Sequence, residues 1–245
     1  MILETRKVSK TFGNIEALID VDMRVDTGEI FGIAGPNGAG KSTLFNVVAG
    51  SFPPSTGKII FRDKDITKLK AHQICHLGLT RTFQIPQTFP TLSVYDNVRV
   101  GAVFGGHDGR RLAKRIRDTL AFLRLTPFTD TLASNLDLYT TKLVMMAACL
   151  ATGCRLLMLD EPLAGLTMLE IKDFLAVVRK INQEQDITVL IIEHILDSLI
   201  DVSDRMLILH NGAVICVGDP EAACRDPKVV EVYLGEGEDG DAQQS

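Results

Sequence analysis

The stretch Gly35-Pro36-Asn37-Gly38-Ala39-Gly40-Lys41-Ser42 decides the fold of this chain. It has the G-x-x-x-x-G-K-S spacing of a phosphate-binding loop. Glycines let such a loop wrap an anion and turn backbone N–H groups toward it. Lys41 then supplies a positive charge for β- and γ-phosphates, and the Ser42 hydroxyl is a ligand for Mg²⁺. The stretch therefore predicts a loop that binds the phosphates of a nucleotide.

The sequence on either side of this loop has the character that the motif requires. Glu29–Ala34 is a short apolar run that predicts a strand, and Thr43–Ala49 has the pattern of a helix. A helix that begins at Ser42 presents the positive end of its dipole to the bound anion. The loop is thus expected at a strand-to-helix junction.

Two acidic residues follow a second apolar run. Leu156–Leu159 predicts a buried strand, and Asp160 and Glu161 come directly after it. Ligands of open α/β sheets bind at the carboxyl ends of strands. Asp160 is therefore expected to hold Mg²⁺, and Glu161 to orient or deprotonate an attacking water. One strand later, Ile191-Ile192-Glu193-His194 places His194 where it can hydrogen-bond a γ-phosphate.

Other apolar runs outline the rest of the chain. Alternation over Leu3–Ser9 predicts an edge strand, and the continuous runs predict central parallel strands covered on both faces. The further expected strands are Ile19–Val25, Gly57–Phe61, Leu77–Phe83, Arg155–Leu159, Thr188–Ile192 and Met206–Leu209. The expected helices are Val94–Val103, Leu112–Leu125, Leu143–Ala151, Leu169–Gln185 and Ile195–Val202. The first three of these helices form a helical insertion at about 90–152.

Composition restricts the classes of function. The chain has 245 residues and a net charge of −5, whereas a nucleic-acid-binding domain is usually basic, so no nucleic-acid partner is expected. Its five cysteines form no C-x-x-C pair, which argues against zinc. No apolar run reaches the roughly 18 residues of a membrane span, and no signal peptide is recognised. The acidic, glycine-rich residues 236–245 predict a flexible tail after a domain of 1–235.

Together these motifs resemble the ABC ATPase family over nearly the whole chain. The loop extended to Thr43, the acidic pair followed by Pro162, and His194 match the family's two nucleotide-binding motifs and its switch histidine. The resemblance implies that Phe12 stacks on adenine and that Gln84 contacts Mg²⁺ and a membrane subunit. It implies the α/β fold of a P-loop ABC nucleotide-binding domain. That fold has a mostly parallel sheet, an N-terminal antiparallel β part and a helical subdomain.

A subfamily is also indicated. Thr43-Leu44-Phe45-Asn46, Arg81-Thr82-Phe83-Gln84, Ile192-Glu193-His194 and Val230–Gly235 are similar to importer ATPases of the branched-chain amino-acid type. This resemblance implies an ATPase on the cytoplasmic face of a membrane, where it docks on integral permease subunits. It also implies a second ATPase subunit and, indirectly, an extracytoplasmic solute-binding protein. The sequence does not name the solute.

The chain departs from the family at its signature motif, L-S-Y-G-Q in this subfamily. Counting back 24 residues from Asp160 reaches Leu136-Asp137-Leu138-Tyr139-Thr140. An ionised Asp137 accepts but does not donate hydrogen bonds. Against a single phosphate charge 4 Å away, its repulsion is about 4 kcal/mol at an effective dielectric near 20. Tyr139 replaces a glycine that permits close backbone approach. Thr167 likewise replaces an acidic or amide residue that helps the two sites communicate.

Two interpretations of this degenerate signature stay open. In the first, the chain works in an asymmetric heterodimer whose partner supplies an intact signature, and the site that this chain completes is weak. In the second, a local rearrangement restores both sites. A regulatory nucleotide-binding subunit without hydrolysis and a soluble ABC ATPase of DNA repair or translation are the rival classes. A basic cluster in the insertion faces either solvent or acidic groups of lipids or permeases, and comprises Arg110, Arg111, Lys114, Arg115 and Arg117.

Overall fold

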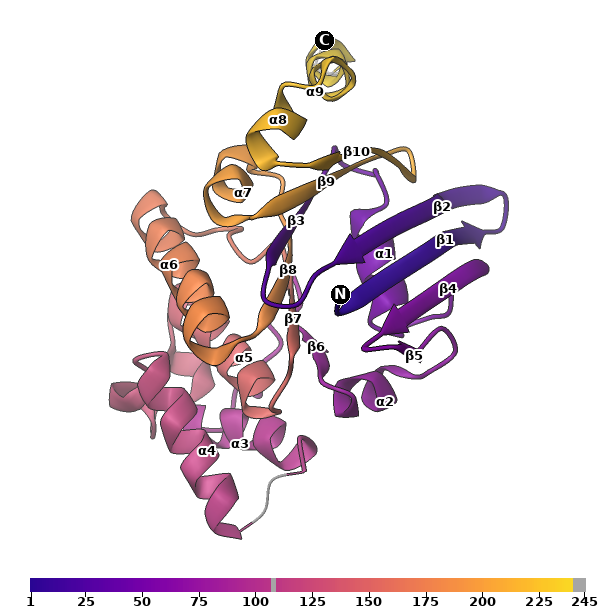
Figure 1. Cartoon of the computed structure of the whole chain (residues 1–245). Coiled ribbons are helices and arrows are strands. Elements are labelled where there is room, and N and C mark those ends of the chain that lie inside the picture. The colour runs from indigo at the N-terminus through magenta and orange to yellow at the C-terminus, as the bar shows by residue number, and fades with distance from the viewer. Residues whose placement is uncertain (107–108, 240–245) are drawn as a thin grey trace. The chain divides into compact units, whose positions relative to one another are not determined.

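The computed structural model describes residues 1–106 and 109–239. The chain forms two compact units, one of residues 1–69 with 190–245 and the other of residues 70–189. Strands and helices are labelled in Figure 1.

An antiparallel sheet opens the first unit, with strand order β2-β1-β4-β5 (Figure 1). Its strands are β1 (Leu3–Phe12), β2 (Ile15–Val25), β4 (Thr56–Phe61) and β5 (Lys64–Asp65). The prediction that β1 is an edge strand is wrong, because β1 pairs with β2 on one side and β4 on the other. Alternation of apolar and polar residues is equally typical of an inner strand whose sheet has one face in solvent.

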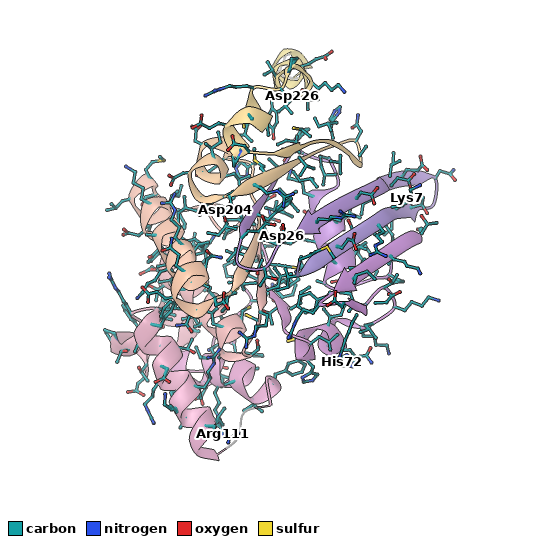
Figure 2. The ribbon with its side chains drawn as sticks, in the orientation of Figure 1. Lys7, Asp26, His72, Arg111, Asp204 and Asp226 are labelled. Carbon is teal, nitrogen blue, oxygen red and sulfur yellow. The ribbon has the colours of Figure 1, made fainter. Side chains whose placement is uncertain are left out.

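The second strand layer of this unit carries the phosphate loop. The strands of this layer follow the order β10-β9-β3-β8. Strand β3 is parallel to β9, and β10 is antiparallel to β9. The strands are β3 (Ile30–Ala34), β8 (Thr188–Ile192, which begins in the second unit), β9 (Arg205–His210) and β10 (Ala213–Gly218). Every residue of β3 and β8 is buried, as their continuous apolar sequence predicts. Asp204, just before β9, accepts a hydrogen bond from the Ile30 amide at 2.7 Å and so fixes the start of β3 (Figure 2).

Four helices accompany these strands. They are α1 (Lys41–Val48), α7 (Leu196–Val202), α8 (Pro220–Cys224) and α9 (Pro227–Asp239). The flexible tail expected at 236–245 stays a prediction, and among the described residues α9 continues through Asp239. Glutamate is a good helix former, so acidic composition alone does not end a helix that Pro227 has begun. Residues 240–245 lie outside the described part of the chain.

The second unit contains the predicted helical insertion together with two parallel strands. The strands are β6 (Leu79–Arg81) and β7 (Leu156–Asp160). The helices are α2 (Ala71–His76), α3 (Val94–Phe104), α4 (Gly109–Phe122), α5 (Leu138–Ala151) and α6 (Met168–Gln185), with 3₁₀ turns at Thr126–Phe128 and Ala133–Asn135. Helices α3, α4 and α5 pack on one another, as Figure 1 shows. The insertion expected at 90–152 thus lies inside a broader unit.

Burial holds β7 in place. Leu156, Leu157, Met158 and Leu159 have no exposed surface. Burying each such side chain contributes about 1.5–3 kcal/mol relative to leaving it exposed. The strand therefore delivers its last residue, Asp160, and the following Glu161 to a fixed position at its carboxyl end.

No helix in the ranges 1–106 and 109–239 combines the length and apolar character that a bilayer span requires.

Candidate functional site

The phosphate loop lies between β3 and α1, where its sequence predicts it. Gly35 has a φ of 147°, and a Cβ there would lie 2.2 Å from the Leu209 carbonyl oxygen. Gly40 has a φ of 103°, and its Cβ would lie 2.5 Å from the Ala17 carbonyl oxygen. Both contacts are too close for any side chain, so glycine is required at both ends of the loop.

Lys41 is the first residue of α1, and its side chain folds back over the loop. Its Nζ donates to the carbonyl oxygens of Gly35 at 2.6 Å and Pro36 at 2.8 Å, and the residue is only 5% exposed. Gly40 forms no side-chain cap on the helix. The first-turn N–H groups of α1 and the Lys41 ammonium therefore mark a site for an anion. Ser42 is exposed and Thr43 half-buried beside them.

Phe12 is an exposed ring at the end of β1, with 46% of the residue accessible. The Phe52 ring packs edge-to-face against it at 5.4 Å. The Lys10 ammonium lies 5.1 Å from the Phe12 ring centre and 5.0 Å from that of Phe52. The ring is therefore held in place by neighbours that sequence analysis did not single out, with surface left to stack on a base.

His194 follows β8, also in the first unit. Its side chain is 53% exposed, and its Nδ1 lies 3.8 Å from the Oε2 atom of the buried Glu193. The Glu193 amide reaches the Ile33 carbonyl of β3 at 3.4 Å. The imidazole is thus accessible to a ligand at the carboxyl end of the strand, as predicted from its position.

Asp160 ends β7 in the second unit and is buried. The Arg81 Nη2 atom, at the end of the neighbouring strand β6, donates to its Oδ2 at 3.0 Å. Burial lowers the pKa of Arg81, and the Asp160 carboxylate opposes that shift. The residue predicted to hold Mg²⁺ therefore has a half-buried cation beside it. The motif Arg81-Thr82-Phe83-Gln84 contains this arginine but does not predict the pairing.

Glu161 and Gln84 are brought together by the fold. The Gln84 Nε2 atom donates to the Glu161 Oε2 atom at 2.6 Å, across 77 residues of sequence. Glu161 has a φ of 44°, an unfavourable backbone conformation for a residue other than glycine. Such strain is typical of residues whose side-chain direction matters for function. The backbone conformation of Glu161 and the hydrogen bond from Gln84 thus both fix the position of the carboxylate predicted to orient water.

The segment predicted to be a degenerate signature opens α5. Asp137 is the N-cap of this helix and accepts a hydrogen bond from the Thr140 amide at 2.7 Å. Tyr139, in the first turn, is half-buried; burial raises the pKa of its phenol, and the Asp173 carboxylate adds to that increase. Leu138 is exposed. Asp137 therefore performs the capping function that a serine would also perform, but without a hydroxyl donor.

Lys142 is a site residue that sequence analysis missed. It is 3% exposed, and its Nζ donates to the carbonyl oxygens of Pro162 at 2.6 Å and Ala164 at 2.7 Å. It thereby ties α5 to the loop that follows Glu161. The available signal was a single positive charge in a helix that is otherwise apolar toward its C-terminal end.

Thr167 caps the next helix. Its hydroxyl accepts from the Glu170 amide, and the Glu170 carboxylate accepts from the Thr167 amide at 2.7 Å, which completes a capping box. A local structural function therefore accounts for the residue that departs from the family pattern.

The basic cluster lies on α4, with Arg111 at its outer end (Figure 2). Lys114 pairs with Asp118 at 2.6 Å, and Arg115 donates to the Leu150 carbonyl. The side chain of Arg110 lies outside the described part of the chain. Two of the cluster's charges thus have partners within the unit.

These features define a class of protein: a phosphate-loop nucleotide-binding domain. The family model described as "ABC transporter" matches residues 18–164, and that described as "Branched-chain amino acid ATP-binding cassette transporter" matches residues 213–239. The chain therefore belongs to the ABC transporter family. It is an ATP-binding, ATP-hydrolysing subunit of such a transporter.

Individual relatives cover nearly the whole chain. A probable branched-chain amino acid transport ATP-binding protein of Archaeoglobus fulgidus is 35% identical over 96% of this chain and 95% of its own. The high-affinity branched-chain amino acid transport ATP-binding protein of Escherichia coli K12 is 31% identical over 96% of this chain and 98% of its own.

Solved structures give the same result for the fold. An ATP-binding cassette of an ABC transporter has a TM-score of 0.88 at 33% identity, covering 95% of this chain and 98% of that one. The ADP conformation of such a cassette has a TM-score of 0.86 at 33% identity, covering 96% and 98%. The predicted ABC fold is confirmed, and the chain is a nucleotide-binding protein.

Proposed function

We propose that this chain binds Mg·ATP and hydrolyses it to power an importer of branched-chain amino acids or related small polar solutes. The observation that carries the nucleotide site is the phosphate loop, with obligatory glycines at 35 and 40 and the Lys41 ammonium held at its centre. The solute class comes from the relatives, which are named as branched-chain amino acid transport proteins.

The residues of the loop bind the phosphates. Amides of the loop and of the first turn of α1 donate to phosphate oxygens, and Lys41 exchanges its loop carbonyls for the β- and γ-phosphates. Phe12 stacks on the adenine. The full proposed nucleotide-binding set is Phe12, Gly35, Pro36, Asn37, Gly38, Ala39, Gly40, Lys41, Ser42 and Thr43.

The oxygen-bearing side chains of the site suit Mg²⁺, which prefers such ligands. We assign Ser42, Gln84 and Asp160 to it. The ion would neutralise charge on the phosphates as the γ-phosphoryl group is transferred to water. Asp160 accepts a hydrogen bond from Arg81 at 3.0 Å, so a cation that binds Asp160 would replace the guanidinium as its partner.

Glu161 acts on the attacking water. A carboxylate accepts the hydrogen of a water and orients its lone pair toward the γ-phosphate. Gln84 donates a hydrogen bond to this carboxylate, and His194 is placed to donate to the γ-phosphate from the end of β8. The reaction is an in-line displacement in which positioning and charge neutralisation supply most of the catalysis.

The chain needs partners to transport a solute. We propose that it docks on integral permease subunits at the cytoplasmic face of the membrane, with an extracytoplasmic solute-binding protein that it does not touch. A second ATPase subunit completes the pair. Asp137 and Tyr139 favour a heterodimer over a homodimer, because a homodimer would carry two weakened sites.

Nucleotide binding can be measured directly on the purified chain. Lys41→Ala is expected to weaken ATP binding by about tenfold or more, because hydrogen bonds to charged groups contribute about 1.5–3 kcal/mol. Lys68→Ala, which removes an exposed lysine of the same unit, is the matched control. Isothermal titration calorimetry gives both affinities. Equal affinity of the two variants would remove the assignment of the phosphate loop.

Transport needs the complex. In proteoliposomes that contain the chain, its permeases and its second ATPase, a solute-binding protein loaded with leucine, isoleucine or valine is expected to stimulate both hydrolysis and uptake. Failure of the chain to copurify with membrane permeases would favour a soluble ABC ATPase instead.

One observation favours a second candidate, a nucleotide-binding regulatory subunit. It is the replacement of the signature serine and glycine by Asp137 and Tyr139. The two functions differ in single-turnover hydrolysis within the assembled complex. Product formed at the site of this chain's own phosphate loop supports the enzyme, and bound ATP that stays intact there supports the regulatory subunit.

A further inference from the structure

A cavity of about 370 Å³ opens in the second unit, among the end of α4, the following 3₁₀ turn, α5 and α6. Small-molecule sites generally measure about 300–1,000 Å³. Apolar side chains form its walls, among them Phe122, Leu125, Phe128, Leu143 and Val177. The cavity therefore has the size and the lining to hold a small apolar group.

Opposite charges border the same cavity. Arg124 and Asp173 both line it, and within the described ranges neither side chain has a hydrogen bond or ion pair. Lys180, the third charged residue of the lining, already has partners: its ammonium lies 4.5 Å from the Phe122 ring centre and 4.0 Å from Glu184. One cation and one anion thus remain available at the rim of an apolar space.

Tyr139 connects this cavity to the signature segment. Its half-buried phenol lines the space. Asp173 adds to the rise in the phenol's pKa that burial causes, whereas Arg124 opposes it. Both charged groups therefore lie close enough to act on the phenol. The residue that departs from the family's glycine is also the residue through which the cavity reaches the start of α5.

From these features we propose that the cavity binds a free α-amino acid with a large apolar side chain. The ligand's carboxylate pairs with Arg124 and its ammonium with Asp173, while its side chain enters the apolar walls. A ligand with a single charge would satisfy one of the two and be repelled by the other. A zwitterion satisfies both, and an amino acid joins its two charges to one apolar group.

Occupancy of this site acts on the signature segment. Tyr139 lies in the first turn of α5, two residues after the cap Asp137. A ligand held against Tyr139 would restrain that turn, so an amino acid on the cytoplasmic side would alter the ATP site that the segment completes. This consequence rests on the proposed function; binding to the cavity does not.

Binding is tested on the purified full chain without nucleotide or permease. Isothermal titration calorimetry compares leucine with three probes that each lack one feature: leucinamide lacks the carboxylate, 4-methylpentanoate the ammonium, and glycine the apolar side chain. Leucine is expected to bind saturably. Leucinamide and 4-methylpentanoate should bind at least about tenfold more weakly, the loss typical of a missing charged partner. Glycine should also bind at least about tenfold more weakly, because it buries no apolar side chain. Absence of saturable leucine binding overturns the proposal.

Variants then locate the site. Asp173→Asn and Arg124→Asn are each expected to weaken leucine binding about tenfold or more. Asparagine tolerates the positive φ of 57° at position 124. Lys172→Gln, next to Asp173 but outside the cavity lining, is the matched control and should bind as the unaltered chain does. Circular dichroism and Tm verify folding, and equal affinity of all three variants places the leucine elsewhere.

The outcomes are separable from those of the transport assay. Leucine binding without reconstituted uptake would leave the cavity site standing and remove the importer assignment. Uptake without leucine binding to the isolated chain would support the importer assignment and remove the cavity site.

Discussion

At the scale of single residues, Lys142 has a structural role that no sequence motif indicates. Its ammonium bridges α5 to the carbonyls of Pro162 and Ala164, in the loop that begins at Glu161. Glu161 itself has a left-handed backbone and a side chain held by Gln84. Lys142 is therefore a positioning residue for the carboxylate that we assign to water activation.

Removing this ammonium should both destabilise the chain and displace Glu161. Lys142→Met removes the donor from the buried Pro162 carbonyl and the half-buried Ala164 carbonyl, so the free energy of unfolding should fall by about 1–3 kcal/mol. Lys142→Arg keeps a donor and should lose less. Urea unfolding measures stability, and hydrolysis in the assembled complex measures kcat and KM. We expect Lys142→Met to lower kcat more than it raises KM; unchanged kcat would show that Lys142 serves stability alone.

The residues of the candidate site differ in how far sequence reveals them. Gly35, Gly40 and Lys41 follow from a motif, because each has a backbone or charge requirement that few residues meet. The Arg81–Asp160 ion pair and the Lys142 bridge do not, because they join segments 79 and about 20 residues apart in sequence. Their geometry comes from tertiary packing, which local sequence patterns do not encode.

At the scale of elements, α5 shows how a segment predicted to be a degenerate signature can remain structurally sound. Asp137 is the N-cap, and aspartate and serine cap helices about equally well. The helix therefore begins at Leu138 with the acceptor that its N-terminus requires. Conversely, the alternation in β1 predicts an edge strand, and this prediction is wrong. The same two-residue period also suits an inner strand with one solvated face.

Two substitutions of the N-cap Asp137 test whether it stabilises α5 by capping. Asp137→Ala removes the hydrogen bond to the Thr140 amide and should lower the free energy of unfolding by about 1 kcal/mol. Asp137→Ser keeps an acceptor at the cap and should change it by only a few tenths. Chemical denaturation of the purified chain measures both. An equal loss in the two variants would mean that the aspartate stabilises α5 by something other than capping.

At the scale of the whole molecule, the order of strands and helices was predictable because the phosphate loop fixes where one parallel strand ends and a helix begins. The apolar runs then placed β7, β8 and β9 to within a residue or two. The sequence patterns do not predict β5, α2, α8, β10 or α9. All but α9 have six residues or fewer, and α9 ends in acidic residues, so none carries a long apolar pattern.

The asymmetry of the ATPase pair is the prediction that belongs to this scale. The chain has a complete phosphate-loop motif and Glu161, but the segment predicted to be its signature offers Asp137 and Tyr139. In the reconstituted complex, Glu161→Gln should remove most turnover, about a hundredfold or more, because it disables the site whose signature the partner supplies. The matching glutamine substitution in the second ATPase should cost little. As a control, nucleotide binding by the Glu161→Gln complex verifies that ATP still binds at the altered site. Equal losses from the two substitutions would instead indicate two working sites, and then a local rearrangement of residues 136–140 must compensate for the missing serine and glycine.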